Sequence, residues 1–85
     1  MAIQHILQHP FTFEGKTYKT VDLRRPKGRD MRGLANIKAE IDQAMFMIQN
    51  LTELSSDEVD EMDIEDITLL ADIIEKMMGE DKIKK

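Results

Sequence analysis

The sequence has 85 residues, of which 34% are charged and none is cysteine, and its formal net charge is −5. A chain of this length has room for one domain with a thin core, and the lack of cysteine excludes disulfides, thiolate catalysis and cysteine-ligated zinc. Residues 1–32 carry a net charge of +4 and residues 33–85 a net charge of −9, so the acidic part argues against nucleic acid as a partner.

Residues 1–24 are predicted to form a β-hairpin, because they are rich in β-branched and aromatic residues on both sides of Gly15. A two-residue loop at Glu14-Gly15 would split the large apolar side chains between the two faces. A three-residue loop pairs odd positions with odd ones, and we therefore prefer it. It places five side chains on one face, which helices must cover: Leu7, Phe11, Phe13, Val21 and Leu23.

Residues 25–35 are predicted to form a basic turn and a short helix. Pro26 and Gly28 end the strand, and Asp30 is placed to cap a helical turn through Leu34. Five cations crowd this region and repel one another: Arg24, Arg25, Lys27, Arg29 and Arg32. Two interpretations stay open, namely ion pairs with the acidic helices of the same chain and contacts with an acidic partner surface. The first four cations are our candidates for partner binding.

Residues 36–54 are predicted to form the longest helix. Its apolar face has three- and four-residue spacing: Ile37, Ile41, Ala44, Met45, Ile48 and Leu51. Met47 lies off this face beside Phe46, which predicts an apolar patch that faces solvent or a partner. Because methionine adapts to irregular surfaces, we expect Phe46, Met47 and Met78 to bind a partner, while Met45 and Met77 fill the core.

The acidic run from Asp57 to Asp66 is predicted to contain a short helix over 56–62. Ser55 and Glu58 have the form of a capping box at its start. A calcium-binding loop needs a glycine at its sixth position, where this run has Met62. We therefore explain the charges by capping and solubility and expect no metal.

The last helix is predicted to run from Asp63, its N-cap, to Gly79, which suits the C′ position. Met62 and Ile67 occupy the positions of a hydrophobic staple. The apolar face of this helix contains Ile64, Ile67, Leu70, Ala71, Ile74, Met77 and Met78. Residues 80–85 are expected to fray.

The predicted fold is a single α+β domain, in which the N-terminal β-hairpin packs against a small bundle of two longer and one or two short helices. No pattern of catalytic residues and no phosphate-binding glycine loop is present, so we expect neither an enzyme nor a cofactor. His5 and His9 share one strand, but no third metal ligand is fixed by spacing. The start of the chain lacks the pattern of a signal peptide, and no stretch has the ~20 apolar residues of a membrane span. We therefore expect a cytoplasmic protein.

Four stretches over nearly the whole chain carry a family resemblance: Phe13-Glu14-Gly15-Lys16-Thr17-Tyr18, the string from Val21 to Met31, Leu54-Ser55, and the stretch from Val59 through Met62, Asp66, Leu69 and Ile73 to Met78. The most specific part is Leu-Arg-x-Pro-x-Gly-x-Asp-hydrophobic after a strand. These stretches resemble the small tail assembly chaperones of Mu-type and P2-type contractile-tailed phages.

The resemblance implies a protein that acts in the host cytoplasm during tail morphogenesis and is absent from the mature virion. Such a protein binds the tape measure protein, keeps it soluble and helps to recruit tail tube protein, and many members also have a longer, frameshifted product. The family has no catalytic residues to carry over. Two alternatives stay open: a small nucleic-acid-binding regulatory module that uses the basic turn, and a minor structural tail protein.

Overall fold

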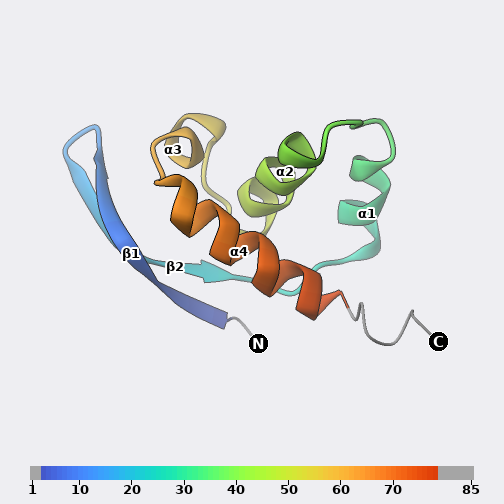
Figure 1. The fold of residues 1–85 in the computed structure, drawn as a ribbon, viewed down its shortest axis with the longest axis horizontal. Helices are drawn as coiled ribbons and strands as arrows, with labels where there is room; N and C mark the ends of the chain where they lie inside the picture. The colour runs from blue at the N-terminus through green and yellow to red at the C-terminus, as the bar shows by residue number, and fades with distance from the viewer. Residues whose placement is uncertain (1–2, 79–85) are drawn as a thin grey trace.

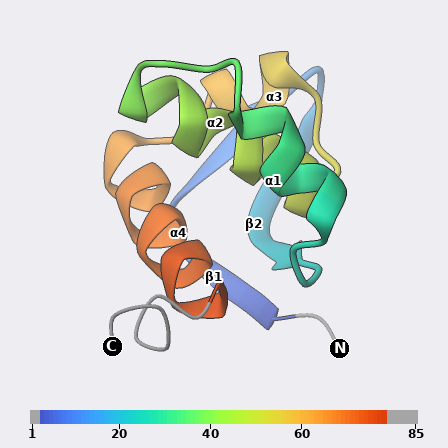
Figure 2. The same cartoon turned by 90° about the vertical axis from the view of Figure 1, so that its right-hand side faces the viewer.

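The computed structural model describes residues 3–78, and its elements follow the predicted order. They are β1 (Ile3–Phe13), β2 (Lys16–Leu23), α1 (Gly28–Leu34), α2 (Glu40–Thr52), α3 (Ser56–Asp60) and α4 (Ile64–Met77). The two strands form a curved antiparallel hairpin, and the helices lie on its concave side (Figure 1). Seen from the α1 end, α2 lies between α1 and α4 (Figure 2). The α+β prediction is confirmed, while the predictions for Gly79 and residues 80–85 fall outside the described residues.

The loop of the hairpin differs from the prediction. Phe13 pairs with Lys16, so the loop is the two-residue Glu14-Gly15, and both of its residues have positive φ, 50° and 83°. Such a loop matches the twist of the flanking strands, and a glycine at its second position carries no strain. The preferred three-residue loop is therefore wrong.

An irregularity in β1 restores the single apolar face despite the shorter loop. Regular pairing is interrupted between Ile6 and Phe11, and beyond it odd residues pair with odd ones, as in His5 with Val21. Four of the five predicted side chains are buried as a result, and Phe13 is half-buried. The face was thus predicted correctly, although the mechanism that forms it was not.

Asp66 in α4 holds this irregular segment in place. Its two carboxylate oxygens accept the backbone N–H groups of Gln8 and His9, at 2.8 and 2.9 Å, and His5 Nε2 lies 3.2 Å from one of them. Pro10, which follows, has no N–H to satisfy. The carboxylate therefore accepts two N–H groups of the segment in which regular pairing with β2 is interrupted.

The core lies between the inner face of the hairpin and α2, α3 and α4. Its buried side chains form one cluster: Leu7, Phe11, Val21, Leu23, Met47, Ile48, Leu51, Val59, Met62, Ile67, Leu70 and Ile74. Phe11 and Tyr18 stack at its edge with ring centroids 4.8 Å apart. The backbone N–H of Arg24 donates to the carbonyl oxygen of Leu51 at 3.0 Å, which ties the end of β2 to the end of α2.

The caps of α3 and α4 are as predicted, whereas α1 and α2 begin differently. Ser55 and Glu58 form the capping box, and Asp63 accepts the N–H of Glu65. Asp30 is not the N-cap of α1 but lies in its first turn, where it accepts the N–H of Lys27 at 2.7 Å. Helix α2 begins four residues later than predicted, because the chain from 35 to 39 forms the connection to α1, and it ends two residues earlier, where Glu53 has a left-handed backbone with φ of 63°.

Candidate functional site

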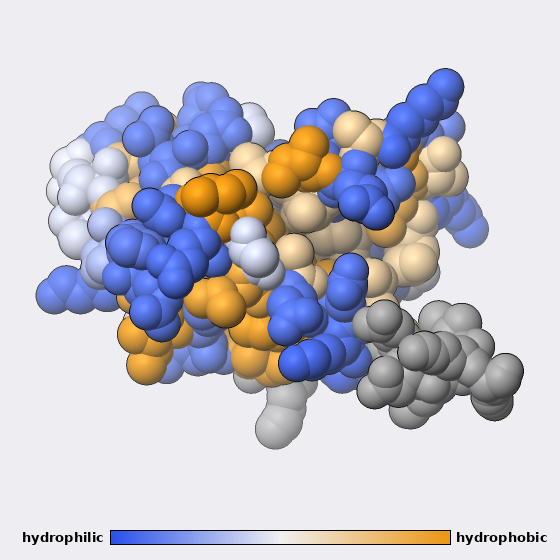
Figure 3. Space-filling view, in the orientation of Figure 1, coloured by the Kyte–Doolittle hydropathy of each residue, from blue (hydrophilic) through white to orange (hydrophobic). Residues whose placement is uncertain are grey.

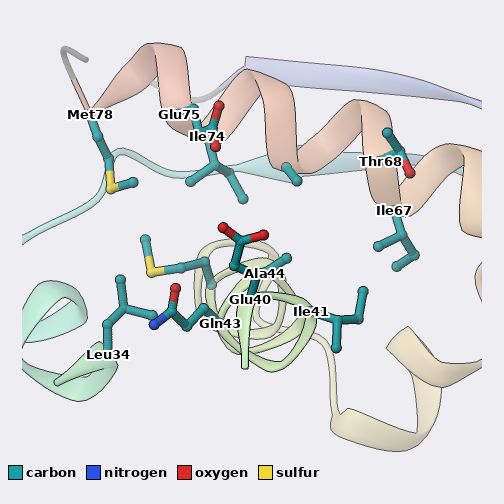
Figure 4. Close-up of a pocket in the computed structure, with 12 residues that line it drawn as sticks. Leu34, Glu40, Ile41, Gln43, Ala44, Ile67, Thr68, Ile74, Glu75 and Met78 are labelled. Atoms are coloured by element: carbon teal, nitrogen blue, oxygen red, sulfur yellow. The ribbon is translucent and has the colours of Figure 1, made fainter. Parts of the chain in front are cut away.

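An open groove lies where α2 crosses α4, with α1 closing one end (Figure 4). Its volume is about 420 Å³. The lining residues come from three helices: Leu34 of α1; Glu40, Ile41, Gln43, Ala44 and Met47 of α2; Ile67, Thr68, Ala71, Ile74 and Glu75 of α4; and Met78, which caps α4. We refer to it as the α2–α4 groove.

Small side chains on both walls explain why the groove exists. Ala44 on α2 and Ala71 on α4 line it and reach no further than a methyl group, so the crossing helices leave space that longer side chains would fill. Ile41 lies at the mouth with 52% of its surface exposed. Helix α2 was predicted to be the longest helix and to bury Ile41, but with 13 residues it is shorter than α4 with 14, and it leaves Ile41 available to a partner.

Two carboxylates border the apolar surface. Glu40 in the first turn of α2 and Glu75 in the last turn of α4 are both exposed and both line the groove (Figure 4). The helix dipole stabilises a negative charge at the position of Glu40 and disfavours one at the position of Glu75. In Figure 3 apolar surface runs between α2 and α4, with hydrophilic side chains beside it. The groove is therefore apolar inside and acidic at its edges.

The three predicted apolar contact residues are placed differently from one another. Met47 is only 3% exposed and belongs to the core, so the predicted solvent-facing patch with Phe46 is wrong at this position. Met47 faces α4. Neighbouring elements cover more of the circumference of α2 than the predicted apolar face, so Met47 is buried as well. Phe46 is half-buried, packs close to Gly33 and does not line the groove. Met47 and Met78 both line the groove, which brings together two of the three.

The four basic residues predicted to bind a partner divide into one paired and three exposed side chains. Arg24 is 24% exposed and forms two 3.0 Å hydrogen bonds with Asp30, which is 1% exposed. Hydrogen bonding by Arg24, followed by the N–H of Lys27, outweighs burial and lowers the pKa of Asp30 to about 2. For Arg24 the interpretation as an internal ion pair is therefore supported, although its partner lies in α1 and not in the acidic helices.

Arg25, Lys27 and Arg29 are exposed and form no ion pair with a carboxylate of residues 3–78. They lie in the turn before α1 and in its first residues, and α2 lies between α1 and the acidic α3 (Figure 1). These three side chains stay available for an acidic partner surface, as one of the two interpretations requires.

The model of one protein family matches residues 4–79, and its description reads "Phage tail assembly chaperone proteins, E, or 41 or 14". The match covers nearly the whole chain. The chain belongs to this family of phage tail assembly chaperones. No curated protein and no solved structure matches it.

A histidine and two carboxylates of this tail assembly chaperone come together at the start of α4. One ligand atom each of His9, Asp63 and Glu65 lies within 4.8 Å of the others, on the surface. His9 Nε2 is 2.7 Å from Glu65, and this hydrogen bond is the main reason why the pKa of His9 is raised. Asp63 is already used as the N-cap of α4. The hydrogen bond between His9 and Glu65 thus links β1 to the first turn of α4 at the surface.

The sequence did not single out the residues that shape the groove. Ala44 and Ala71 were assigned to apolar helix faces, where their small size among large neighbours was the available signal. Glu40 and Glu75 resemble any other surface carboxylate until the two helices are placed against each other.

Within residues 3–78, no helix has the length and apolar character needed to cross a membrane.

Proposed function

We propose that this chain acts during tail assembly by binding the tape measure protein and holding it in solution, without catalysis. The observation that carries the proposal is the family match over residues 4–79, which makes tail proteins the partners of the chain. The α2–α4 groove supports it, because an open apolar surface on an otherwise charged protein is a feature of sites that bind protein segments.

The proposed mechanism is masking. A partner segment that would aggregate when bare covers its apolar side with the groove, while the acidic side chains of α3 and α4 keep the complex soluble. Arg25, Lys27 and Arg29 provide a second, electrostatic contact, which fits tail tube protein or another region of the tape measure protein. Arg24 has a structural role beside Asp30 and is no longer part of this contact.

The site of action in this proposal is the host cytoplasm, and the mature virion does not contain the chain. Mass spectrometry of purified particles tests the second statement directly. Detection of the chain at a fixed stoichiometry in particles would favour the alternative of a structural tail protein.

The central experiment is co-expression with the tape measure protein encoded in the same genome. We expect a larger soluble fraction of the tape measure protein in the presence of this chain, and co-purification of the two. A soluble fraction that is the same with and without the chain would contradict the proposal. A shift of DNA or RNA by the chain alone at low salt, weakened by substitution of Arg25 and Arg29, would instead favour the nucleic-acid-binding alternative.

A further inference from the structure

We infer that the α2–α4 groove binds an amphipathic α-helical segment whose apolar ridge is flanked by lysine or arginine. This inference rests on the proposed function, since it names the kind of partner segment that the groove takes.

The lining of the groove favours a helix over an extended peptide. All of its walls are helices, so no unpaired strand edge is available there to add a strand by backbone hydrogen bonds. The wall formed by α4 runs from Ile67 to Met78, which corresponds to about 16 Å at 1.5 Å per residue. A helix of about three turns has that length, and its side chains at i, i+3 or i+4, i+7 and i+11 can act as anchors along it.

The chemistry of the lining argues against a small polar ligand. Ile41, Ala44, Met47, Ala71 and Ile74 present apolar surface, and the charged groups, Glu40 and Glu75, are exposed at the edges. Sites for small polar molecules place several buried polar groups so that they converge on the ligand. The methionines at the base and at one end adapt to anchors of different shape.

Charge complementarity indicates which residues flank the apolar ridge of the bound helix. Glu75 lies in the last turn of α4, where the helix dipole disfavours a carboxylate, so local stability gives no reason for it. Together with Glu40 it places negative charge beside the apolar floor on both helices. A docked helix therefore gains from basic residues beside its apolar ridge and is repelled if it carries acidic ones.

The first test fills the groove in the full chain co-expressed with the tape measure protein. Ala71→Leu places a larger apolar side chain between the walls, and Ala35→Leu adds the same atoms at an exposed position outside the lining. We expect Ala71→Leu to abolish the increase in soluble tape measure protein and Ala35→Leu to retain it. Thermal unfolding shows whether each variant is folded.

The second test reverses one charge without disturbing the fold. Glu75→Lys follows the helix dipole, and Glu61→Lys, at the C-cap of α3, is the matched control. Binding is measured by fluorescence anisotropy with overlapping peptides of about 20 residues that cover the tape measure sequence. For the best-binding peptide we expect Glu75→Lys to weaken binding by about threefold to tenfold at low salt, and Glu61→Lys to leave it unchanged. A peptide with glutamate in place of its lysines should regain affinity for Glu75→Lys.

The outcomes separate the two proposals. If wild type keeps the tape measure protein soluble and Ala71→Leu and Glu75→Lys do so equally well, the groove inference is overturned and the proposed function stands. If wild type has no effect on the tape measure protein, the proposed function fails and the inferred occupant fails with it. If the best-binding peptides are acidic or extended, the inferred chemistry of the occupant is wrong.

Discussion

Arg24, directly after β2, and Asp30 in α1 form a two-point ion pair, with two nitrogen–oxygen distances of 3.0 Å. Asp30 also accepts the N–H of Lys27 at 2.7 Å, and Asn50 of α2 lies 3.4 Å from it. A single buried carboxylate thus joins the sheet, the turn, α1 and α2. For that reason Arg24, one of the five cations between residues 24 and 32, has a structural role.

Removal of either partner of this pair should destabilise the protein. Asp30→Ala leaves the guanidinium of Arg24 without its main partner, and breaking a buried pair costs about 3 kcal/mol in the free energy of unfolding. Urea unfolding of Arg24→Ala, Asp30→Ala and the double variant measures the coupling, and the double variant should lose less than the two single losses combined. Arg29→Ala, at an exposed position, is the control and should change stability by less than ~0.5 kcal/mol. Strict additivity would contradict the pairing.

The same pair predicts loss of stability in acid. The folded pKa of Asp30 is about 2, below its ordinary value of 3.8, so the unfolded chain binds a proton more tightly than the folded one. The contribution is therefore fully present above about pH 5 and declines as the pH falls through 3.8 towards 2, by up to about 2 kcal/mol. Urea midpoints between pH 5 and pH 2.5 measure this decline. Asp30→Asn should flatten it, and an equally steep decline in that variant would exclude Asp30 as its source.

Asp66 should be required for the irregular segment of β1. Burial raises the pKa of Asp66, but the N–H groups of Gln8 and His9 and the ring of His5 outweigh this effect, and the net pKa is lowered. Asp66→Ala leaves two backbone N–H groups without an acceptor and should cost about 2–4 kcal/mol, while Asp66→Asn, which keeps one oxygen, costs less. Hydrogen exchange of the Gln8 and His9 amides reports the effect directly. Unchanged protection of these amides in Asp66→Ala would show that they are held in another way.

Gly33 and Gly28 offer a matched pair of alanine substitutions in α1. A Cβ at Gly33 would overlap the ring of Phe46, whereas one at Gly28 meets no atom within 4 Å. Alanine favours a helix by about 1 kcal/mol over glycine, and displacing a packed ring costs about 1–3 kcal/mol. We expect Gly33→Ala to lower the melting temperature and Gly28→Ala to leave it unchanged or raise it. Phe46→Leu should reduce the loss caused by Gly33→Ala; if it does not, the clash is not the cause.

His9 should titrate above its ordinary pKa of 6.5, chiefly because of its hydrogen bond to Glu65. A raised folded pKa means that the contribution of this contact to stability is complete below pH 6.5 and disappears as the pH rises through the folded value. NMR titration of the imidazole measures the pKa, and Glu65→Gln should lower it. Asp72→Asn is the control, because Asp72 pairs with Lys76 on a different turn of α4.

The sequence alone was sufficient for the features that depend on neighbours along the chain. The order of the elements, the capping box of Ser55 and Glu58 and the N-cap Asp63 follow from residues within a few positions of one another. The buried face of the hairpin followed from its alternating pattern, and the family resemblance from short strings of residues. The element order and the two caps depend on local interactions, whereas the single buried face of the hairpin also depends on the irregularity in β1 that Asp66 of α4 holds.

Only the tertiary structure decided the features that join distant segments. The carboxylate of Asp66 permits a break in the ladder between β1 and β2. Asp30 pairs with Arg24, so that Arg24 is not available to a partner as the other basic residues of the turn are. Met47 is buried because α4 covers a side of α2 that lies off the predicted apolar face, and Ile41 is exposed at the mouth of a groove that the small side chains of Ala44 and Ala71 leave unfilled. A helix pattern states which side chains are apolar, but the packing partner determines which of them lose contact with water.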